Sequence, residues 1–174
     1  WEAEGPVPDG AKVRVSLAPA VDGARRPGAE IAAGDAGAGR KELSLAVAKP
    51  ALWDVGSPNL HFATVELVDA DGTALDRERI RFGIRRIAFP VPTEGPDVTN
   101  RAANGFHLNG RRVQLKGANL HSDLGLLGMA FDRSAARRQL EIMKDMGVNA
   151  LRTSHNPPAP EVLDLCDEMG IFVW

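Results

Sequence analysis

Cysteine is nearly absent from this chain of 174 residues: it has only Cys166, so no disulfide can form within it. Long apolar runs are missing as well, and no segment approaches the length of a transmembrane helix. An excess of charge of either sign is also missing, because the formal net charge is −2. That balance gives no electrostatic case for binding nucleic acid or an anionic membrane.

The apolar and charged fractions are 44% and 25%, which are ordinary for a globular protein. The length suffices for one domain and part of another. We expect an internal piece of a longer protein, because the chain begins abruptly at Trp1 and ends inside an apolar run. No signal peptide is visible, and cytoplasmic, periplasmic and secreted locations all stay open. Cys166 lies on an apolar helix face, which indicates a buried structural thiol.

The first half alternates apolar and polar residues, as half-buried β-strands do. This alternation predicts strands over Ala11–Leu17, Glu42–Val47, Phe62–Val68 and Ala74–Phe82. Residues 69–72, Asp-Ala-Asp-Gly, predict a hairpin turn between the last two strands, since Asp tolerates the bend and Gly supplies positive φ. Short strands separated by Gly, Pro and Asp are typical of a small β-sandwich, which we place at residues 1–92.

Three further segments bear on the organisation of the chain. Ile84, Ile87 and Phe89 predict one more edge of the sandwich. The Gly- and Ala-rich segment from Gly34 to Gly39 predicts a mobile turn. Residues 93–103 are polar and lack periodicity, so they predict a linker between two domains.

The second half, residues 104–174, alternates strand and helix patterns. Asn109-Gly110 is a strong signal for a hairpin over Phe106–Val113. Helices are expected at Arg133–Met146, capped by Asp132, and at Pro160–Met169, which stops at Gly170. The apolar runs beside them predict strands at Val113–Gly117, Val148–Leu151 and Ile171–Trp174. This strand–helix order predicts a parallel sheet.

Polar side chains follow two of these strands. Asn119–Asp123 comes after the first, and Arg152–Pro158 comes directly after the second. Chemistry in α/β folds takes place at the carboxyl ends of parallel strands, where His121, Arg152 and His155 are therefore expected to converge. A purely structural interpretation, in which Arg152 caps carbonyls and His155 is a hydrogen-bonding loop residue, stays open at this point.

Four motifs in one order closely resemble the start of the catalytic barrel of glycoside hydrolase family 2, the family of β-galactosidases, β-glucuronidases and β-mannosidases. The motifs are Phe106–Gly110, Leu115–His121, Met143–Pro157 and Leu165–Ile171. Earlier in the chain, Leu52–Leu60 and Gly83–Ile87 resemble segments of the immunoglobulin-like domain that precedes this barrel. The resemblance implies an immunoglobulin-like β-sandwich followed by the first βα units of an incomplete (β/α)8 barrel.

Two positions depart from the family pattern, because the chain contains no tyrosine. His61 and Asn156 stand where many members have Tyr. Trp53 has two interpretations, a platform for sugar stacking or a core residue against the sandwich, and the burial habit of Trp favours the core.

The resemblance implies a set of residues that bind the sugar. His121 matches the histidine of the family that contacts the sugar at the bottom of the pocket, and Asp123 matches an acidic hydroxyl-binding position. Arg152 matches the arginine beside the nucleophile, where its charge holds a carboxylate ionised. His155 matches the histidine that hydrogen-bonds sugar hydroxyls near the transition state, and Asn156 follows it.

Both catalytic glutamates of the family lie in later barrel strands, so we expect them beyond Trp174 and expect this piece alone to be inactive. The resemblance implies a retaining exo-β-glycosidase, and it favours β-galactosidase while leaving β-glucuronidase and β-mannosidase open. A non-catalytic carbohydrate-binding or structural module is the rival interpretation. The implied partners are a carbohydrate substrate and the rest of the same polypeptide. Oligomers, and a divalent cation in the full-length enzyme, stay open.

Overall fold

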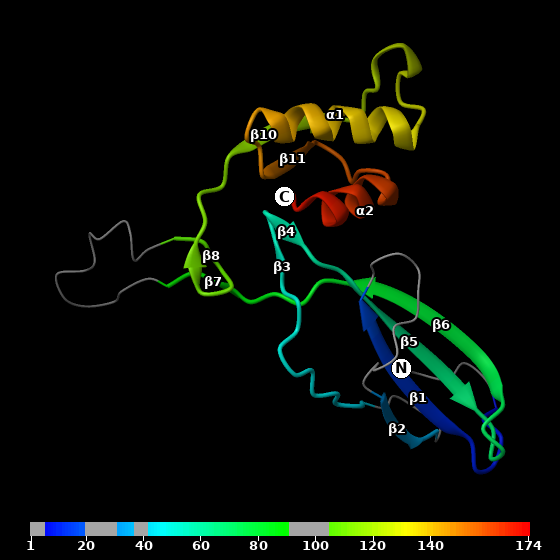
Figure 1. Ribbon diagram of the computed structural model, residues 1–174. Helices are drawn as coiled ribbons and strands as arrows, with labels where there is room; N and C mark the ends of the chain where they lie inside the picture. Colours follow the sequence, from blue (N-terminus) through cyan, green and yellow to red (C-terminus); the bar gives the residue numbers. More distant parts are fainter. Residues whose placement is uncertain (1–5, 20–30, 37–41, 91–104) are drawn as a thin grey trace. The chain divides into compact units, whose positions relative to one another are not determined.

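A computed structural model describes residues 6–19, 31–36, 42–90 and 105–174 of the chain (Figure 1). The chain forms two compact units. The first unit contains Trp1–Ala51 and Leu60–Ile84, and the second contains Leu52–Asn59 and Arg85–Trp174. The predicted division at 92 differs from this one at residues 52–59 and 85–90. The predicted linker, 93–103, lies outside the described residues.

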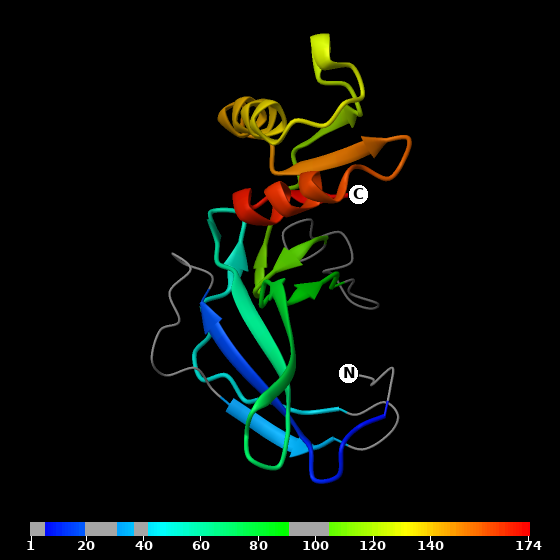
Figure 2. The same cartoon turned by 90° about the vertical axis from the view of Figure 1, so that its right-hand side faces the viewer.

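The first unit contains a four-stranded antiparallel sheet with the order β2-β1-β5-β6. Its strands are β1 (Lys12–Pro19), β2 (Ile31–Asp35), β5 (His61–Val68) and β6 (Ala74–Phe82). Figure 2 shows β5 and β6 as the long twisted hairpin of this sheet. Three of the four predicted strands are confirmed, because alternation of apolar and polar residues reports a strand with one covered face.

The predicted turn between β5 and β6 is confirmed. The Asp69 carboxylate accepts hydrogen bonds from the backbone N–H groups of Asp71 and Thr73, at 3.0 and 2.8 Å. Gly72 has a φ of 85°, which residues with a Cβ rarely adopt. An acceptor side chain at the start and a glycine at the bend therefore fix the hairpin.

A row of charged residues crosses this sheet, since Arg14, Glu66 and Arg77 are register neighbours on β1, β5 and β6. The Glu66 side chain is 1% exposed and forms ion pairs with Arg14 at 2.8 Å and with Arg77 at 2.6 Å. Burial raises the pKa of Glu66, but the hydrogen bonds and charges of Arg77 and Arg14 outweigh it, so the pKa lies below its ordinary value.

Two predictions in this unit are wrong. Residues 42–47 form no strand, although their exposure still alternates along the chain. The Leu43 side chain packs so closely over Gly34 that a Cβ there would lie 2.7 Å from it. Apolar and polar residues alternate over Glu42–Val47 because one side of this segment packs against the protein. The segment forms no backbone hydrogen-bond ladder with another strand. Gly34 itself belongs to β2 and to no turn, while residues 37–41 lie outside the described part.

Ile87 does not extend the first sheet. It belongs to β7 (Ile87–Ala88), which pairs with β8 (His107–Leu108), and β8 in turn pairs with β9 (Arg111–Arg112) in the second unit. The predicted Asn109-Gly110 turn between β8 and β9 is confirmed, with both residues at positive φ. Among the described residues, the first unit shows one sheet, and no second sheet of the predicted sandwich falls within them.

The second unit contains the predicted parallel sheet, in the order β10-β11-β12. Its strands are β10 (Gly117–His121), β11 (Ala150–Ser154) and β12 (Phe172–Val173). The expected strand 113–117 is wrong, and the expected strand 148–151 begins and ends too early. Both real strands run into the polar motifs, because barrel strands carry polar side chains at their carboxyl ends. An apolar run marks only the part of the strand that the helices cover.

The helices α1 (Arg133–Asp145) and α2 (Pro160–Met169) agree with their predicted positions. The Asp132 side chain accepts from the Ala135 N–H at 2.7 Å, the predicted N-cap bond. A shared core joins both helices to β11, and its buried members are Ala136, Leu140, Leu151, Leu165, Cys166 and Ile171. Met146, the C-cap of α1, is 76% exposed, because ten residues past Ala136 the helix has turned away from the core.

A short hairpin from the middle of the chain completes the second unit. It consists of β3 (Trp53–Asp54) and β4 (Ser57–Pro58). Trp53 is 1% exposed, and its ring meets that of Phe172 edge to face with centroids 5.2 Å apart. Its indole N–H donates to the Asp167 carbonyl at 2.7 Å. Trp53 is thus a core residue, as favoured, but its core is that of the helices and parallel strands.

Further contacts hold this hairpin in place. Asn109 donates from its side-chain amide to the Trp53 carbonyl at 3.0 Å, and Arg111 forms an ion pair with Asp54. Lys144 donates to the Val55 carbonyl at 3.3 Å. Gly170, at a φ of 70°, lies so close that a Cβ there would be 2.7 Å from the Val55 oxygen. The close approach requires a residue without a side chain at the end of α2.

Cys166 is buried in the core, as predicted, and burial together with the charge of Asp167 raises its pKa to about 12. The thiolate needed for nucleophilic chemistry is therefore disfavoured at neutral pH.

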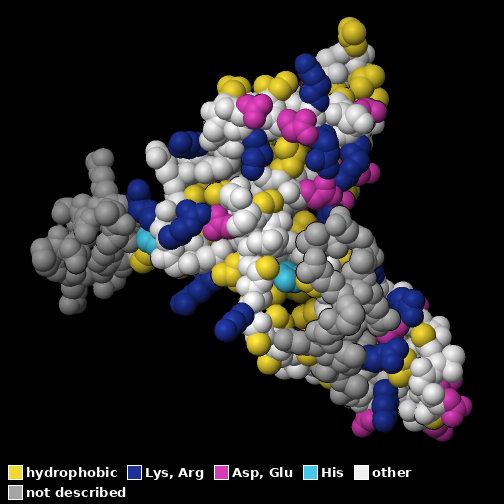
Figure 3. All heavy atoms as spheres, viewed as in Figure 1, with side chains coloured by type: hydrophobic (Ala, Val, Ile, Leu, Met, Phe, Trp, Pro, Cys, Tyr) yellow, Lys and Arg dark blue, Asp and Glu magenta, His cyan; other side chains and the backbone are white. Residues whose placement is uncertain are grey.

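In the described ranges, neither helix has the length and apolar character needed to cross a bilayer. On the face drawn in Figure 3, basic and acidic side chains are interspersed.

Candidate functional site

The site is built at one end of two adjacent parallel strands. In the register of β10 and β11, Asn119 lies beside Arg152 and His121 lies beside Ser154. Ala118, Leu120 and Leu151 pack against the helical core, so the alternate residues face the other side of the sheet. The pairing therefore brings the carboxyl ends of the two predicted motifs together at one edge.

Three of the five predicted site residues meet there. The rings of His121 and His155 form an edge-to-face pair with centroids 5.7 Å apart. One guanidinium nitrogen of Arg152, Nη2, lies 3.3 Å from Nδ1 of His155, and the other, Nη1, donates to the Ser154 hydroxyl at 3.1 Å. The peptide bond between Ser154 and His155 is cis. The predicted convergence of His121, Arg152 and His155 is thus present, and their role in binding sugar remains a prediction.

Sequence reasoning missed two residues of this cluster. Ser154 is buried and supplies the acceptor that holds the Arg152 guanidinium. Trp174 follows β12 and lies beside Arg152, with the guanidinium carbon 6.0 Å from the ring centroid. Its backbone continues the parallel ladder, because Trp174 N–H donates to the Leu151 carbonyl at 2.8 Å. The sequence could have indicated Trp174 as a site residue, because it directly follows an apolar strand, as Arg152 does.

A hollow lies on the face of the sheet that carries Arg152. It has a volume of about 430 Å³ and is lined by Leu115, Gly117, Asn119, Ala150, Arg152 and Trp174, with Ala118 and Leu151 at its floor. Gly117, Asn119 and Arg152 alternate with the core-facing residues of their strands. In a barrel this face would be the interior. The hollow extends from the amino ends of β10 and β11, at Gly117 and Ala150, to Arg152, and it does not include His121 or His155.

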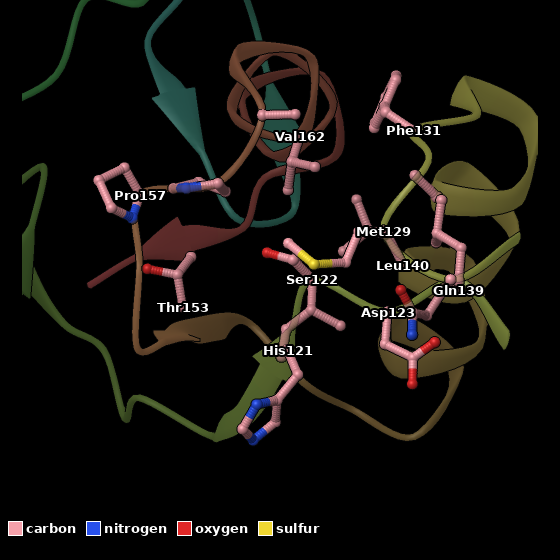
Figure 4. Close-up of a pocket in the computed structure, with 16 residues that line it drawn as sticks. His121, Ser122, Asp123, Met129, Phe131, Gln139, Leu140, Thr153, Pro157 and Val162 are labelled. Atoms are coloured by element: carbon pink, nitrogen blue, oxygen red, sulfur yellow. The ribbon is translucent and has the colours of Figure 1, made fainter.

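Asp123 and Asn156 are not part of the cluster. The Asp123 carboxylate accepts from the Gly125 N–H at 2.8 Å and lines a cavity of about 230 Å³ together with Met129, Gln139 and Val162. Figure 4 shows the ring of His121 directed away from Asp123 and from the centre of that cavity. Asn156 is exposed on the loop after β11. Both were grouped with the others by the family resemblance, and their contact with sugar stays a prediction.

The cluster carries one permanent positive charge, that of Arg152, beside two imidazoles. A guanidinium there favours an anionic neighbour, such as a carboxylate. The described part of the chain contains no group of three His, Cys, Asp or Glu side chains placed to hold a metal ion. The divalent cation considered for the full-length protein therefore stays a prediction.

Two family models match the chain, and both belong to one family. Residues 7–85 match the model "Glycosyl hydrolases family 2", and residues 99–174 match "Glycosyl hydrolases family 2, TIM barrel domain". The first match ends before the predicted linker, residues 93–103, and the second begins inside it at residue 99. The second covers β10, β11 and β12, and with them every candidate residue.

Relatives that this chain resembles agree with these matches. The β-galactosidase BoGH2A of Bacteroides ovatus is 41% identical over 143 residues, 80% of this chain. A crystal structure of a family 2 member from Bacteroides cellulosilyticus covers 94% of the chain with a TM-score of 0.75 and 32% identity. A β-glucuronidase from Parabacteroides merdae covers 94% with a TM-score of 0.70 and 34% identity.

The chain spans only part of these proteins. It covers 15% of the length of the B. ovatus enzyme and 20% and 19% of the two crystallised chains. The matches confirm the predicted fold class, an antiparallel β domain followed by the first βα units of a TIM barrel. This chain belongs to glycoside hydrolase family 2.

Proposed function

We propose that the full-length protein is a retaining exo-β-glycosidase that removes terminal β-linked galactose. The observation that carries this proposal is the cluster of His121, Arg152 and His155 at the carboxyl ends of β10 and β11. Its support from relatives is the 41% identity to a β-galactosidase. The present chain supplies groups that position the sugar, and the two catalytic carboxyl groups come from later strands.

The chemistry assigns a distinct part to each residue. A retaining glycosidase uses two carboxyl groups about 5–5.5 Å apart, one as nucleophile and one as acid and base. The charge of Arg152 keeps the neighbouring nucleophile ionised. His121 and His155 form hydrogen bonds with sugar hydroxyls, and those bonds that strengthen as positive charge develops on the ring accelerate the reaction.

Asp123 and Asn156 stay in the proposal as predicted sugar contacts, although the structure places neither against the cluster. The Asp123 carboxylate faces the second cavity, so it contacts sugar only where the substrate extends over the loop after β10. A substitution Asp123→Asn tests this part of the proposal separately, since it leaves the Gly125 N–H an acceptor oxygen.

A second candidate activity is β-glucuronidase. It is favoured by the 34% identity to the crystallised enzyme from P. merdae and by the 37% identity to a putative β-glucuronidase of Formosa agariphila. A β-mannosidase activity has the family pattern alone in its favour. The rival interpretation, a non-catalytic module, has less support because both matching models are those of hydrolases.

The test is to purify the full-length protein and measure kcat/KM on the 4-nitrophenyl β-D-galactoside, β-D-glucuronide and β-D-mannoside. The galactoside is expected to be the best substrate by at least about tenfold, roughly 1.4 kcal/mol of transition-state preference. A larger kcat/KM on the glucuronide would transfer the proposal to the second activity. Absence of turnover on all three would overturn it. Proton NMR of the first sugar released is expected to show the β-anomer, as retention requires.

A further inference from the structure

Arg152 and His155 are joined by a contact whose direction is fixed by chemistry. The guanidinium of arginine has five N–H donors and no acceptor, and it stays protonated in proteins. Its Nη2 lies 3.3 Å from Nδ1 of His155. For this contact to be a hydrogen bond, Nδ1 must be the acceptor and must carry no proton. The neutral imidazole then holds its proton on Nε2.

The guanidinium is itself held in place. Arg152 and Ser154 are two positions apart on β11 and therefore point to the same face of the sheet. Nη1 of Arg152 donates to the Ser154 hydroxyl at 3.1 Å, and the Ser154 residue is 5% exposed. Trp174, from the neighbouring strand, lies beside the same guanidinium. A buried serine thus anchors the arginine, and the arginine orients the imidazole.

His155 is exposed, so a ligand can approach its imidazole, which the ring of His121 meets edge to face with centroids 5.7 Å apart. Only two of the five donors of Arg152 are used by Ser154 and His155, so the arginine can also hold an anion without releasing the ring. When Nδ1 of His155 accepts from Arg152, the other ring nitrogen, Nε2, carries the proton and can donate it to a bound ligand. That ligand must then offer an acceptor atom, such as an oxygen.

We propose that Arg152 is a positioning residue that holds His155 in the tautomer protonated at Nε2, which makes His155 a hydrogen-bond donor to a hydroxyl oxygen of the terminal sugar. The identification of the partner as a sugar rests on the proposed function, and the tautomer does not. If His155 donates to the oxygen of a sugar hydroxyl, the proton of that hydroxyl can still be donated to another acceptor.

The first experiment is neutron diffraction from deuterium-exchanged crystals of the full-length protein at about pH 8, where an ordinary imidazole is neutral. Deuterium is expected at Nε2 of His155 and not at Nδ1. In Arg152→Met, which keeps an unbranched side chain but no donor, part of the deuterium is expected to move to Nδ1, because neither ring nitrogen then has a fixed partner. Arg138→Met is the matched control, since Arg138 is exposed on α1. Deuterium at Nδ1 in the wild-type protein would overturn the proposal.

The second experiment uses inhibition constants for D-galactose and its 3-, 4- and 6-deoxy and deoxyfluoro forms. Fluorine keeps an acceptor where the deoxy sugar has none. At the position bound by His155, the fluoro sugar is expected to bind about 3- to 10-fold more tightly than the deoxy sugar, the worth of one hydrogen bond. Arg152→Met should bring this ratio toward one, while Arg138→Met should leave it unchanged. Equal binding of both forms at every position in the wild-type enzyme would contradict the proposal.

The two experiments separate this inference from the proposed function. A full-length protein that cleaves none of the three glycosides, yet carries deuterium at Nε2 of His155, removes the proposed activity and keeps the positioning role of Arg152. A protein that cleaves the galactoside but carries deuterium at Nδ1 keeps the activity and removes the positioning role. Ser154→Ala gives a further check. It removes the hydroxyl that holds Arg152 but keeps the guanidinium, so less deuterium should move from Nε2 to Nδ1 of His155 than in Arg152→Met.

Discussion

The indole N–H of Trp53 donates a 2.7 Å hydrogen bond to the backbone carbonyl of Asp167, which lies 114 positions later in the chain. That carbonyl belongs to the last turn of α2, where helices leave acceptors without partners inside the helix. The hairpin of β3 and β4 therefore caps the end of α2. Since the Trp53 ring also packs against Phe172 of β12, the same side chain fixes a helix and the strand that follows it.

The close approach between Gly170 and this hairpin predicts the effect of a single methyl group. Gly170→Ala should destabilise the protein, since alanine is strained at a φ of 70° and its Cβ would lie 2.7 Å from the Val55 oxygen. Gly147→Ala is the matched control. Gly147 also ends a helix at positive φ, 86°, but a Cβ there would meet no atom within 4 Å.

Urea unfolding of both full-length variants measures the difference between the two sites. Gly147→Ala is expected to cost about 1–2 kcal/mol, the strain of a left-handed alanine. Gly170→Ala should cost at least about 1 kcal/mol more, as overpacking does. Equal losses for the two variants would mean that the hairpin moves aside freely and does not hold the end of α2.

His155→Ala is expected to lower kcat/KM of the full-length enzyme on an aryl β-galactoside by about 100-fold or more. The lost hydrogen bond is one that strengthens as charge develops on the sugar ring. His107→Ala is the control, because His107 lies in β8 and contacts the Gly105 carbonyl, apart from the cluster. Steady-state kinetics within about twofold of wild type for His155→Ala would assign the residue a structural role only.

Glu66→Gln is expected to destabilise the first unit at neutral pH by about 1.5–3 kcal/mol, the range for hydrogen bonds to charged groups. Because the folded-state pKa of Glu66 is lowered, its ion pairs stabilise the fold above the ordinary value of 4.5, and this contribution is lost as pH falls through the lowered pKa. The gap between wild type and variant should therefore close in acid. Thermal unfolding at pH 7 and at decreasing pH measures it.

The control for this substitution is Glu78→Gln, on the neighbouring strand, where the side chain is exposed. An exposed charge contributes little, so this variant should unfold close to wild type at every pH. A loss for Glu66→Gln that stays constant as the pH falls would show that shape and packing matter at this position and that its charge does not.

Residues 1–174 expressed alone should not hydrolyse an aryl β-galactoside. Asp123 is the only carboxylate in the polar stretches that follow β10 and β11, whereas the mechanism needs two carboxyl groups at one site. The assay compares this piece with a buffer blank. Turnover above the blank that disappears in Asp123→Asn would place a catalytic acid at Asp123 and contradict the assignment of both carboxylates to later strands.

Local patterns predicted the helices, the turns and the core better than the limits of the strands. Caps and stops act within a few residues, so Asp132, Gly147 and Gly170 mark their helix ends in the sequence itself. Strand ends are set by partners far away in sequence. Asn119 and Arg152 are polar, yet both lie inside strands because β10 and β11 pair through them. The same limitation explains residues 42–47, where alternation appeared without pairing.

The site could be predicted where residues shared a position relative to a strand. His121, Arg152 and His155 follow or end apolar runs, and the parallel ladder brings such positions together. Ser154 gave no signal, because a buried serine in a strand looks like any other small residue. Trp53 was assigned to the wrong core, since the segments on both sides of Leu52–Asn59 belong to the first unit while the contacts of Trp53 are with Asp167 and Phe172.

The contacts of the β3–β4 hairpin limit how enzymes of this kind can be recombined. A chimera joined at the polar segment near residue 92 would exchange the β domain and, with it, the eight residues that cap α2 and cover Phe172. The donor's hairpin would then have to fit a foreign helix end, at a spot where even one methyl group on Gly170 is too large. Exchange of the β domain is therefore expected to succeed when Leu52–Asn59 stays with its own barrel.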